Sequence, residues 1–226
     1  MPALICYGGT FDPVHNGHLA VARAARDALR ATVFLLPAAD PPHKGPTHAD
    51  ALQRARMLDL AIAGEPGLKV DRRELERDGP SYTFDTLLEL RAQVGPARPV
   101  AWLVGGDSLN QLHTWHRWRE LFEHAHVVAV QRPGSHIDPE TLRCVAPEVA
   151  AEAAARWTTL EALQNAPAGG LAVLPLQELR PESSTELRRL IAARDPAWRT
   201  WVPPSVAGYI DRHDLYSTVA PDSGFL

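Results

Sequence analysis

The sequence has few cysteines, few lysines and no long apolar run. Only Cys6 and Cys144 occur among its 226 residues. Two cysteines are too few for a disulfide framework, so we expect a reduced, cytoplasmic setting. No stretch approaches the length of a transmembrane helix, and the short apolar run at the start ends in glycines, unlike a signal peptide. These absences argue against a membrane protein and against a secreted one.

Acidic and basic side chains are nearly balanced. The chain carries 23 Lys and Arg against 27 Asp and Glu, a formal net charge of −4. A general nucleic-acid binder usually shows a basic excess, so we expect neither nucleic acid nor membrane as a partner. Apolar residues make up 45% and charged residues 22% of the chain, as in an ordinary globular protein. The sequence is compatible with a homo-oligomer but does not decide the oligomeric state.

Apolar runs alternate with amphipathic stretches along the chain. Strands are expected at 4–7, 32–36, 69–71, 100–104, 127–130 and 171–174. Helices are expected at 18–30, 49–63, 83–93, 108–111, 118–124, 185–193 and 204–212, and the alanine-rich segment 139–164 is also expected to be helical. This alternation predicts an α/β fold, a doubly wound, mostly parallel sheet with helices on both faces. We expect a single domain over residues 1–216 and a loose tail over 217–226.

The stretch from Gly8 to Leu19 carries the strongest functional signal. It joins an expected strand to an expected helix through two glycines, an arrangement that directs backbone N–H groups at an anion. Without a Cβ, Gly8 and Gly9 let a phosphate approach the main chain closely. His15 and His18 are three residues apart at the helix start, so they share a face and both rings can point at one anion.

The residues from Gly8 to Leu19, Gly-Gly-Thr-Phe-Asp-Pro-Val-His-Asn-Gly-His-Leu, resemble the signature of the HxGH nucleotidyltransferases. The twelve-residue form is most similar to that of bacterial nicotinate-nucleotide adenylyltransferases, and the resemblance extends over nearly the whole chain. It implies a Rossmann-like fold and a catalytic role for His15 and His18 on the ATP phosphates. It also implies ATP binding by Gly8, Gly9, Thr10 and Phe11.

A second motif is Pro41-Pro42-His43-Lys44. From the residues alone it is a proline-stiffened loop, either solvated or presenting Lys44 as a point charge to a phosphate. The resemblance favours the second interpretation and implies that Lys44 is a catalytic and substrate-binding phosphate contact.

A third motif is Ser81-Tyr82-Thr83, just before a helical pattern. Ser81 or Thr83 is a helix N-cap in the plainest interpretation, and a helix start also offers N–H groups to an anion. In the resembling family this position holds the nicotinate carboxylate, partly through backbone amide, so Thr83 is expected to bind the acceptor.

A fourth motif runs from Gly105-Gly106-Asp107 to Trp115-His116. Asp107 follows a strand end and is either another N-cap or an acceptor for ribose hydroxyls. The resemblance implies that Gly105 and Asp107 bind ATP, that Asp107 also binds the acceptor, and that Trp115 stacks on its pyridine ring. His116 stands where the family often has tyrosine. It binds the acceptor either through its backbone amide, which the change preserves, or through its ring, which the change alters.

A fifth motif, Ser183-Ser184-Thr185 with Arg188 one turn later, opens a helix. It is either a phosphate site or a capping box with a surface arginine. The resemblance implies that all four residues bind ATP and that Arg188 is catalytic. The family's form has isoleucine where this chain has Glu182 and Leu187, and the sequence does not show which way Glu182 points.

The resemblance implies transfer of AMP from ATP to nicotinate mononucleotide, giving deamido-NAD and pyrophosphate in NAD biosynthesis. Mg²⁺ would assist, coordinated mainly by ATP oxygens. Three alternatives remain: a related adenylyltransferase acting on nicotinamide mononucleotide or phosphopantetheine, a non-catalytic nucleotide-binding regulator, and a metal site made of histidines. The last lacks a carboxylate or thiol partner at matching spacing, so we expect no protein-held metal.

Overall fold

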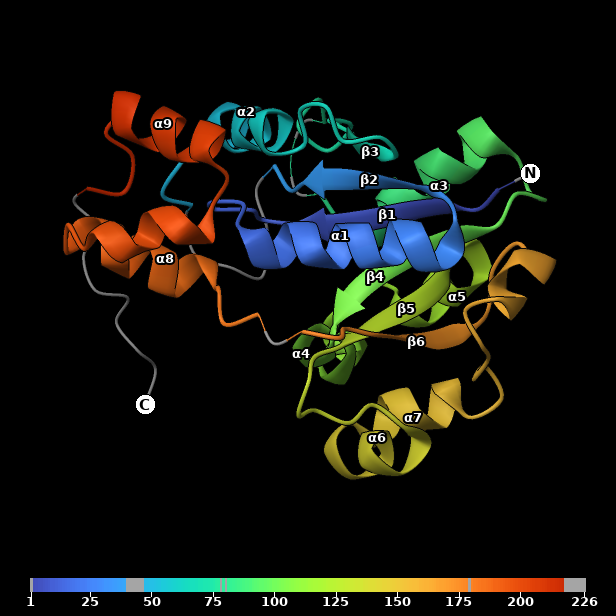
Figure 1. Ribbon diagram of the computed structural model, residues 1–226. Coiled ribbons are helices and arrows are strands. Elements are labelled where there is room, and N and C mark those ends of the chain that lie inside the picture. The colour runs from blue at the N-terminus through green and yellow to red at the C-terminus, as the bar shows by residue number, and fades with distance from the viewer. Residues whose placement is uncertain (1, 40–46, 78, 80, 179, 218–226) are drawn as a thin grey trace.

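Six strands form one parallel sheet in the computed structural model (Figure 1). They are β1 (Leu4–Gly9), β2 (Thr32–Pro37), β3 (Leu68–Val70), β4 (Val100–Gly105), β5 (His126–Gln131) and β6 (Leu171–Pro175). The order is β3-β2-β1-β4-β5-β6 and every neighbouring pair is parallel. The chain therefore winds outward twice from the centre, with the change of direction between β1 and β4. Ligands of such sheets bind beyond the carboxyl ends of the strands at this point.

The structure describes residues 2–39, 47–77, 79, 81–178 and 180–217.

Helices cover both faces of the sheet (Figure 1). The α-helices are α1 (Asn16–Leu29), α2 (Ala51–Ala61), α3 (Thr83–Val94), α4 (Gly106–Asn110), α5 (Leu121–His124), α6 (Pro139–Val145), α7 (Pro147–Ala153), α8 (Ser184–Ala192) and α9 (Pro204–Arg212). Short 3₁₀ turns are η1 (Leu112–Thr114), η2 (Trp118–Glu120), η3 (Ala162–Asn165) and η4 (Pro196–Trp201). Helices α1, α2, α8 and α9 contribute to one apolar cluster, and α3 to α7 contribute to the other.

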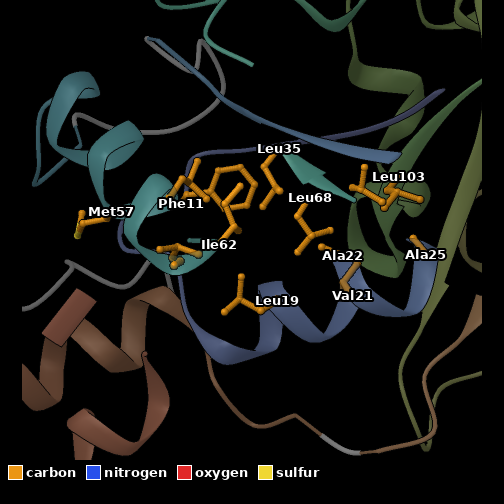
Figure 2. Packing of buried hydrophobic residues seen from close by; sticks show 14 of the residues in the cluster. Phe11, Leu19, Val21, Ala22, Ala25, Leu35, Met57, Ile62, Leu68 and Leu103 are labelled. Atoms are coloured by element: carbon orange, nitrogen blue, oxygen red, sulfur yellow. The ribbon is translucent and has the colours of Figure 1, made fainter. Parts of the chain in front are cut away.

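The strands are continuously apolar because both faces of the sheet are buried. Within β1, Ile5 packs into the cluster of α1 and α8, while Leu4 and Cys6 pack into the opposite cluster. Figure 2 shows Leu19 of α1 on the side of the sheet where Leu35 and Leu68 lie. A fully buried side chain of this size stabilises the fold by about 1.5–3 kcal/mol. The alternation of side chains along each strand thus fixes the layer on which each helix packs.

The predicted fold class is confirmed, and each predicted strand overlaps an observed one. The expectation that 139–164 is helical is confirmed in part, because α6, α7 and η3 lie in this segment but residues 154–161 are not helical. Pro147 disfavours helical backbone at Ala146, where φ is −147°, so the segment splits into α6 and α7. Further on, Trp157 makes a parallel bridge with Leu171 of β6. Among the described residues, no helix is long and apolar enough to cross a membrane.

Candidate active site

A cleft of about 760 Å³ lies at the carboxyl ends of the central strands. It brings together parts of the chain that are far apart in sequence: the β1–α1 turn, the starts of α3, α4 and α8, and the segment after α4. Most of the predicted site residues line it, namely Gly8, Gly9, Thr10, Phe11, His18, Thr83, Gly105, Asp107, Trp115, His116, Ser184, Thr185 and Arg188. The motifs found separately in the sequence therefore form one site.

The two glycines of the β1–α1 turn are required by packing inside the protein. A Cβ on Gly8 would lie 2.5 Å from a ring carbon of Trp102, and one on Gly9 would lie 2.9 Å from the ring of Phe11. Phe11 is buried and has φ of 51°, a left-handed conformation that costs energy for a bulky residue. Its ring packs edge-on against Tyr7 and His18, at centroid distances of 5.5 and 5.0 Å. The turn is thus held in shape by aromatic contacts before any ligand binds.

His15 and His18 cap the start of α1 reciprocally. The backbone N–H of His18 donates to Nδ1 of His15 and the backbone N–H of His15 donates to Nδ1 of His18, both at 3.3 Å. The rings stack with centroids 3.6 Å apart. Because Nδ1 accepts in each ring, the neutral imidazole carries its proton on Nε2. Each neutral ring therefore carries an Nε2–H donor, the kind of group that can stabilise an oxyanion.

The two rings differ in environment. His18 lines the cleft and also a small neighbouring cavity, whereas His15 is 4% exposed and borders only that cavity. Burial, with a smaller contribution from the charge of Arg132, lowers the pKa of His15 to about 3. His15 is therefore neutral at pH 7 and acts as a hydrogen-bond donor without a full charge.

Asp12 anchors the turn to distant segments, a role that sequence reasoning missed. Its buried carboxylate accepts hydrogen bonds from the backbone N–H groups of His48 (2.8 Å) and Ala49 (3.1 Å) and from the hydroxyl of Tyr216 (2.8 Å). Burial and the neighbouring Asp12 charge raise the pKa of Tyr216, so its hydroxyl remains a donor. No pattern in the sequence pairs residues 12 and 216.

Buried Arg54, also missed, fixes the same turn from α2. Its guanidinium donates to the carbonyl oxygens of Thr10 (2.7 Å), Ala39 (3.0 Å) and Ala49 (3.3 Å). A fully buried arginine satisfied by carbonyl oxygens is a rigid connector. An arginine on the otherwise apolar face of a predicted helix was the signal that could have identified it.

The start of α8 is fastened to the β1–α1 turn by two side chains of the predicted phosphate motif. Ser184 Oγ donates to the carbonyl oxygen of Pro13 (3.0 Å), and Arg188 Nη1 donates to that of Asp12 (2.8 Å). Ser183 does not line the cleft, because it is the N-cap of α8 and its Oγ accepts from the N–H of Glu186 (3.2 Å). The capping interpretation is thus confirmed for Ser183, while Thr185 faces the cleft.

The start of α3 forms the opposite wall. The N-cap is Tyr82, which makes no side-chain capping bond, so the expectation of Ser81 or Thr83 as cap is wrong. Ser81 Oγ instead donates to the carbonyl oxygen of Glu74 (3.4 Å). The first N–H groups of α3, including that of Thr83, are therefore not used by a side-chain cap, as suits an anion site.

A buried acid that the sequence did not single out lines the cleft beneath this wall. Glu74 is 5% exposed and its Oε1 accepts from the hydroxyl of Thr86 at 2.8 Å. Burial raises the pKa of the Glu74 carboxyl. The residue joins the turn after β3 to helix α3 and so supports the start of that helix.

The fourth motif supplies the exposed part of this wall. Gly105 is the N-cap of α4 and Asp107 lies in its first turn, exposed at the cleft, so the N-cap alternative for Asp107 is wrong. Trp115 is half-buried and packs against the apolar cluster behind it. The ring of His116 is tilted by 37° against that of Tyr82, with centroids 4.6 Å apart. His116 also lines the cleft.

Lys44 and the proline loop lie outside the described residues. Within the described part of the chain, no group of three or more His, Cys, Asp or Glu side chains is arranged to hold a metal ion.

Comparison with known proteins agrees with this geometry. Residues 6–190 match the family model described as cytidylyltransferase-like. A Stenotrophomonas maltophilia protein named probable nicotinate-nucleotide adenylyltransferase is 51% identical over 98% of this chain and 100% of its own length. A Laribacter hongkongensis protein of the same name is 46% identical over 97% of this chain and 96% of its own length.

Among solved structures, a Plasmodium falciparum nicotinic acid mononucleotide adenylyltransferase complexed with NaAD superposes with a TM-score of 0.72. The match covers 96% of this chain and 98% of that one at 17% identity, and shows a shared fold. The chain belongs to the cytidylyltransferase-like family of nucleotidyltransferases. Within that family it groups with the nicotinate-nucleotide adenylyltransferases.

Proposed function

We propose that this protein transfers AMP from ATP to nicotinate mononucleotide, giving deamido-NAD and pyrophosphate. The observation that carries the proposal is that one cleft joins an HxGH turn, the start of α8 and an aromatic wall beside an uncapped helix start. The first two parts suit a polyphosphate, and the third suits a planar acid. The chain is also 51% identical to a protein named probable nicotinate-nucleotide adenylyltransferase, which supports the same acceptor.

The reaction needs no protein nucleophile. The 5′-phosphate of the acceptor is anionic at pH 7 and attacks the α-phosphorus of ATP, so that a P–O bond forms as the α–β bridging bond breaks. Negative charge grows on the α-phosphate and on the departing pyrophosphate. Donors fixed in advance stabilise this charge without reorganising. We assign this role to Nε2–H of His18, the guanidinium of Arg188 and the hydroxyl of Thr185, and we propose the same role for Lys44.

Mg²⁺ remains part of the proposal as an ion carried by ATP. Its contribution when bound would be to neutralise charge on the phosphate oxygens. The carboxylate of Asp12 is already occupied by three donors, and no cage of acidic or histidine ligands occurs among the described residues. Such a donor set fits a metal held mainly by ATP oxygens.

The acceptor wall favours an acid over an amide. A carboxylate only accepts hydrogen bonds, as N–H groups at the start of α3 require, whereas a carboxamide would turn its NH₂ toward one of them. An unpaired buried donor costs about 1–3 kcal/mol, or roughly ten- to a hundredfold in kcat/KM.

We place the reaction in the cytoplasm, where ATP is available.

The test is pyrophosphate release with ATP and three acceptors: nicotinate mononucleotide, nicotinamide mononucleotide and phosphopantetheine. We expect the acid to have the highest kcat/KM at both pH 6 and pH 8. A preference for the amide at both pH values would reject the nicotinate assignment, and turnover of phosphopantetheine alone would move the protein to another branch of the family. Nucleotide binding without turnover of any acceptor would favour a regulator.

A further inference from the structure

A second, smaller cavity lies behind the histidines. It measures about 20 Å³, room for one water molecule, and shares Tyr7, His18 and Arg132 with the lining of the main cleft. Its walls come from the end of β1, the start of α1, the residue after β5 and the connection between β6 and α8. The polar residues on these walls are His15, His18, Arg132, Arg180 and Glu182, with Tyr7.

Glu182 is the only carboxylate among the described residues that line this cavity, and it is incompletely partnered. Its side chain is 8% exposed, and its Oε1 lies 3.9 Å from Nη1 of Arg180. Its Oε2 is buried and has no hydrogen-bond partner among the described residues, and Nε of Arg180 is in the same state. At 3.9 Å this contact is too long for a hydrogen bond.

The other groups around the cavity suit an anion. Arg132 borders both the cavity and the cleft, and its side chain makes no hydrogen bond or ion pair with a described residue. His15 and His18 also line the cavity. The other polar groups of the wall would attract an anion to this place. Glu182 puts a negative charge at the same place, so it opposes the binding of a further anion there.

We propose that Glu182 acts as an internal anion that weakens binding of the polyphosphate. The inference rests on the proposed function, because it places the phosphates of ATP and the pyrophosphate product beside His18. A buried carboxylate repels a nearby phosphate more strongly than an exposed one, since solvent screens it less. The repulsion acts on ATP and on pyrophosphate alike, so it also speeds product release. Glu182 is a positioning residue in this scheme and takes no part in bond making.

The chain offers a matched control for this charge. Glu178 also pairs with Arg180, at 2.9 Å from Nη2, but its side chain is 76% exposed and does not border the cavity. Glu178→Gln and Glu182→Gln remove the same charge from the same arginine. Only Glu182→Gln removes it from within the cavity.

The experiment is calorimetric titration of inorganic pyrophosphate and of ATP into the full-length wild type and the two variants, with Glu182→Ile as a second form of the buried change. We expect Glu182→Gln and Glu182→Ile to bind both ligands about five- to tenfold more tightly, the scale of one partly screened charge. Glu178→Gln should bind like the wild type, and the KM for nicotinate mononucleotide should stay unchanged in all three.

Unchanged or weaker pyrophosphate binding in both Glu182 variants would overturn the inference, and weaker binding would mean that the carboxylate organises the arginines. The result is separable from the proposed function. Tighter pyrophosphate binding without turnover of nicotinate mononucleotide would reject the reaction and keep the role of Glu182.

Discussion

The two walls of the cleft are built differently. The phosphate wall, made of the β1–α1 turn and the start of α8, is fixed by hydrogen bonds within the protein: the reciprocal caps of His15 and His18, and the contacts of Asp12, Ser184 and Arg188. The acceptor wall, made of the starts of α3 and α4 and the segment to residue 116, is supported from behind by apolar packing and by the hydrogen bonds of Ser81 and Thr86 to Glu74. No side chain of a described residue caps α3, and the carboxylate of Asp107 accepts no hydrogen bond from one.

This difference matches what each wall has to do. Groups that stabilise charge in a transition state are most effective when already oriented, because reorientation would cost energy during the reaction. Groups that select a substrate must leave their donors and acceptors available to it. We therefore expect changes in the phosphate wall to alter kcat or folding stability, and changes in the acceptor wall to alter KM.

The largest effect should come from His18→Ala. The Nε2–H donor of His18 is needed mainly when charge builds on the leaving group. Its loss should therefore lower kcat by raising the activation free energy by about 2–4 kcal/mol, while the KM for the acceptor changes little. Steady-state kinetics with nicotinate mononucleotide measures both quantities. His113→Ala, at an exposed histidine outside the cleft, is the control and should keep wild-type kinetics. Near-normal turnover of His18→Ala would remove His18 from the mechanism.

Asp12→Ala should lower the free energy of unfolding by about 2–3 kcal/mol, because it strips an acceptor from two buried donors and one partly buried donor. Tyr216→Phe removes only one of those hydrogen bonds and should cost about 1 kcal/mol. Urea denaturation of both variants checks the order. If Tyr216→Phe cost as much as Asp12→Ala, the hydroxyl contact would dominate, and the contacts to residues 48 and 49 would not matter.

Low pH should lower the free energy of unfolding through protonation of His15 in the phosphate wall. Its pKa of about 3 in the folded protein lies below the value of about 6.5 for an unfolded chain. The contribution to stability is therefore present above pH 6.5 and is lost as the pH falls toward 3, by about 1 kcal/mol between pH 6.5 and 5.5. Urea unfolding across this range should show a shallower pH slope in His15→Gln than in the wild type. His113→Gln should retain the wild-type slope, and identical slopes in all three proteins would contradict the burial of a neutral His15.

The effect of Trp115→Ala should be confined to the acceptor wall. Loss of ring stacking raises KM about tenfold for the acid and the amide alike, because both carry the same ring. The preference for the acid should persist, since it comes from the start of α3. Measurement of kcat/KM for both acceptors decides this, and a collapse of the preference in Trp115→Ala would place selectivity on the tryptophan.

The sequence predicted the parallel, doubly wound sheet because this follows from local patterns, and the family resemblance implied the residues of the acceptor wall. Apolar periodicity identifies strands, and motifs such as Gly105–Asp107 mark strand ends that must meet at one edge of a parallel sheet. Even there, local capping rules failed at Ser81, whose hydroxyl turns to Glu74. Ser81 does make a local hydrogen bond, but its partner is the carbonyl oxygen of Glu74 and not the start of α3.

What could not be predicted is the network that stiffens the phosphate wall. The contact between Asp12 and Tyr216 spans 204 positions in the chain, and nothing in either local sequence requires it. Gly8 and Gly9 are required because the rings of Trp102 and Phe11 leave no room for a Cβ, and a sequence pattern does not reveal these contacts. His15 and His18 likewise differ in burial, although their spacing made them equivalent in the sequence.

A double-mutant cycle between the two walls tests their independence most directly. The values of kcat/KM for nicotinate mononucleotide would be measured for the wild type, His18→Ala, Trp115→Ala and the double variant. If one wall stabilises the transition state and the other binds the acceptor ring, the two losses of activation free energy add to within about 0.5 kcal/mol. A coupling energy above about 1 kcal/mol would contradict the account, because it would mean that the aromatic wall helps to orient the phosphate chemistry.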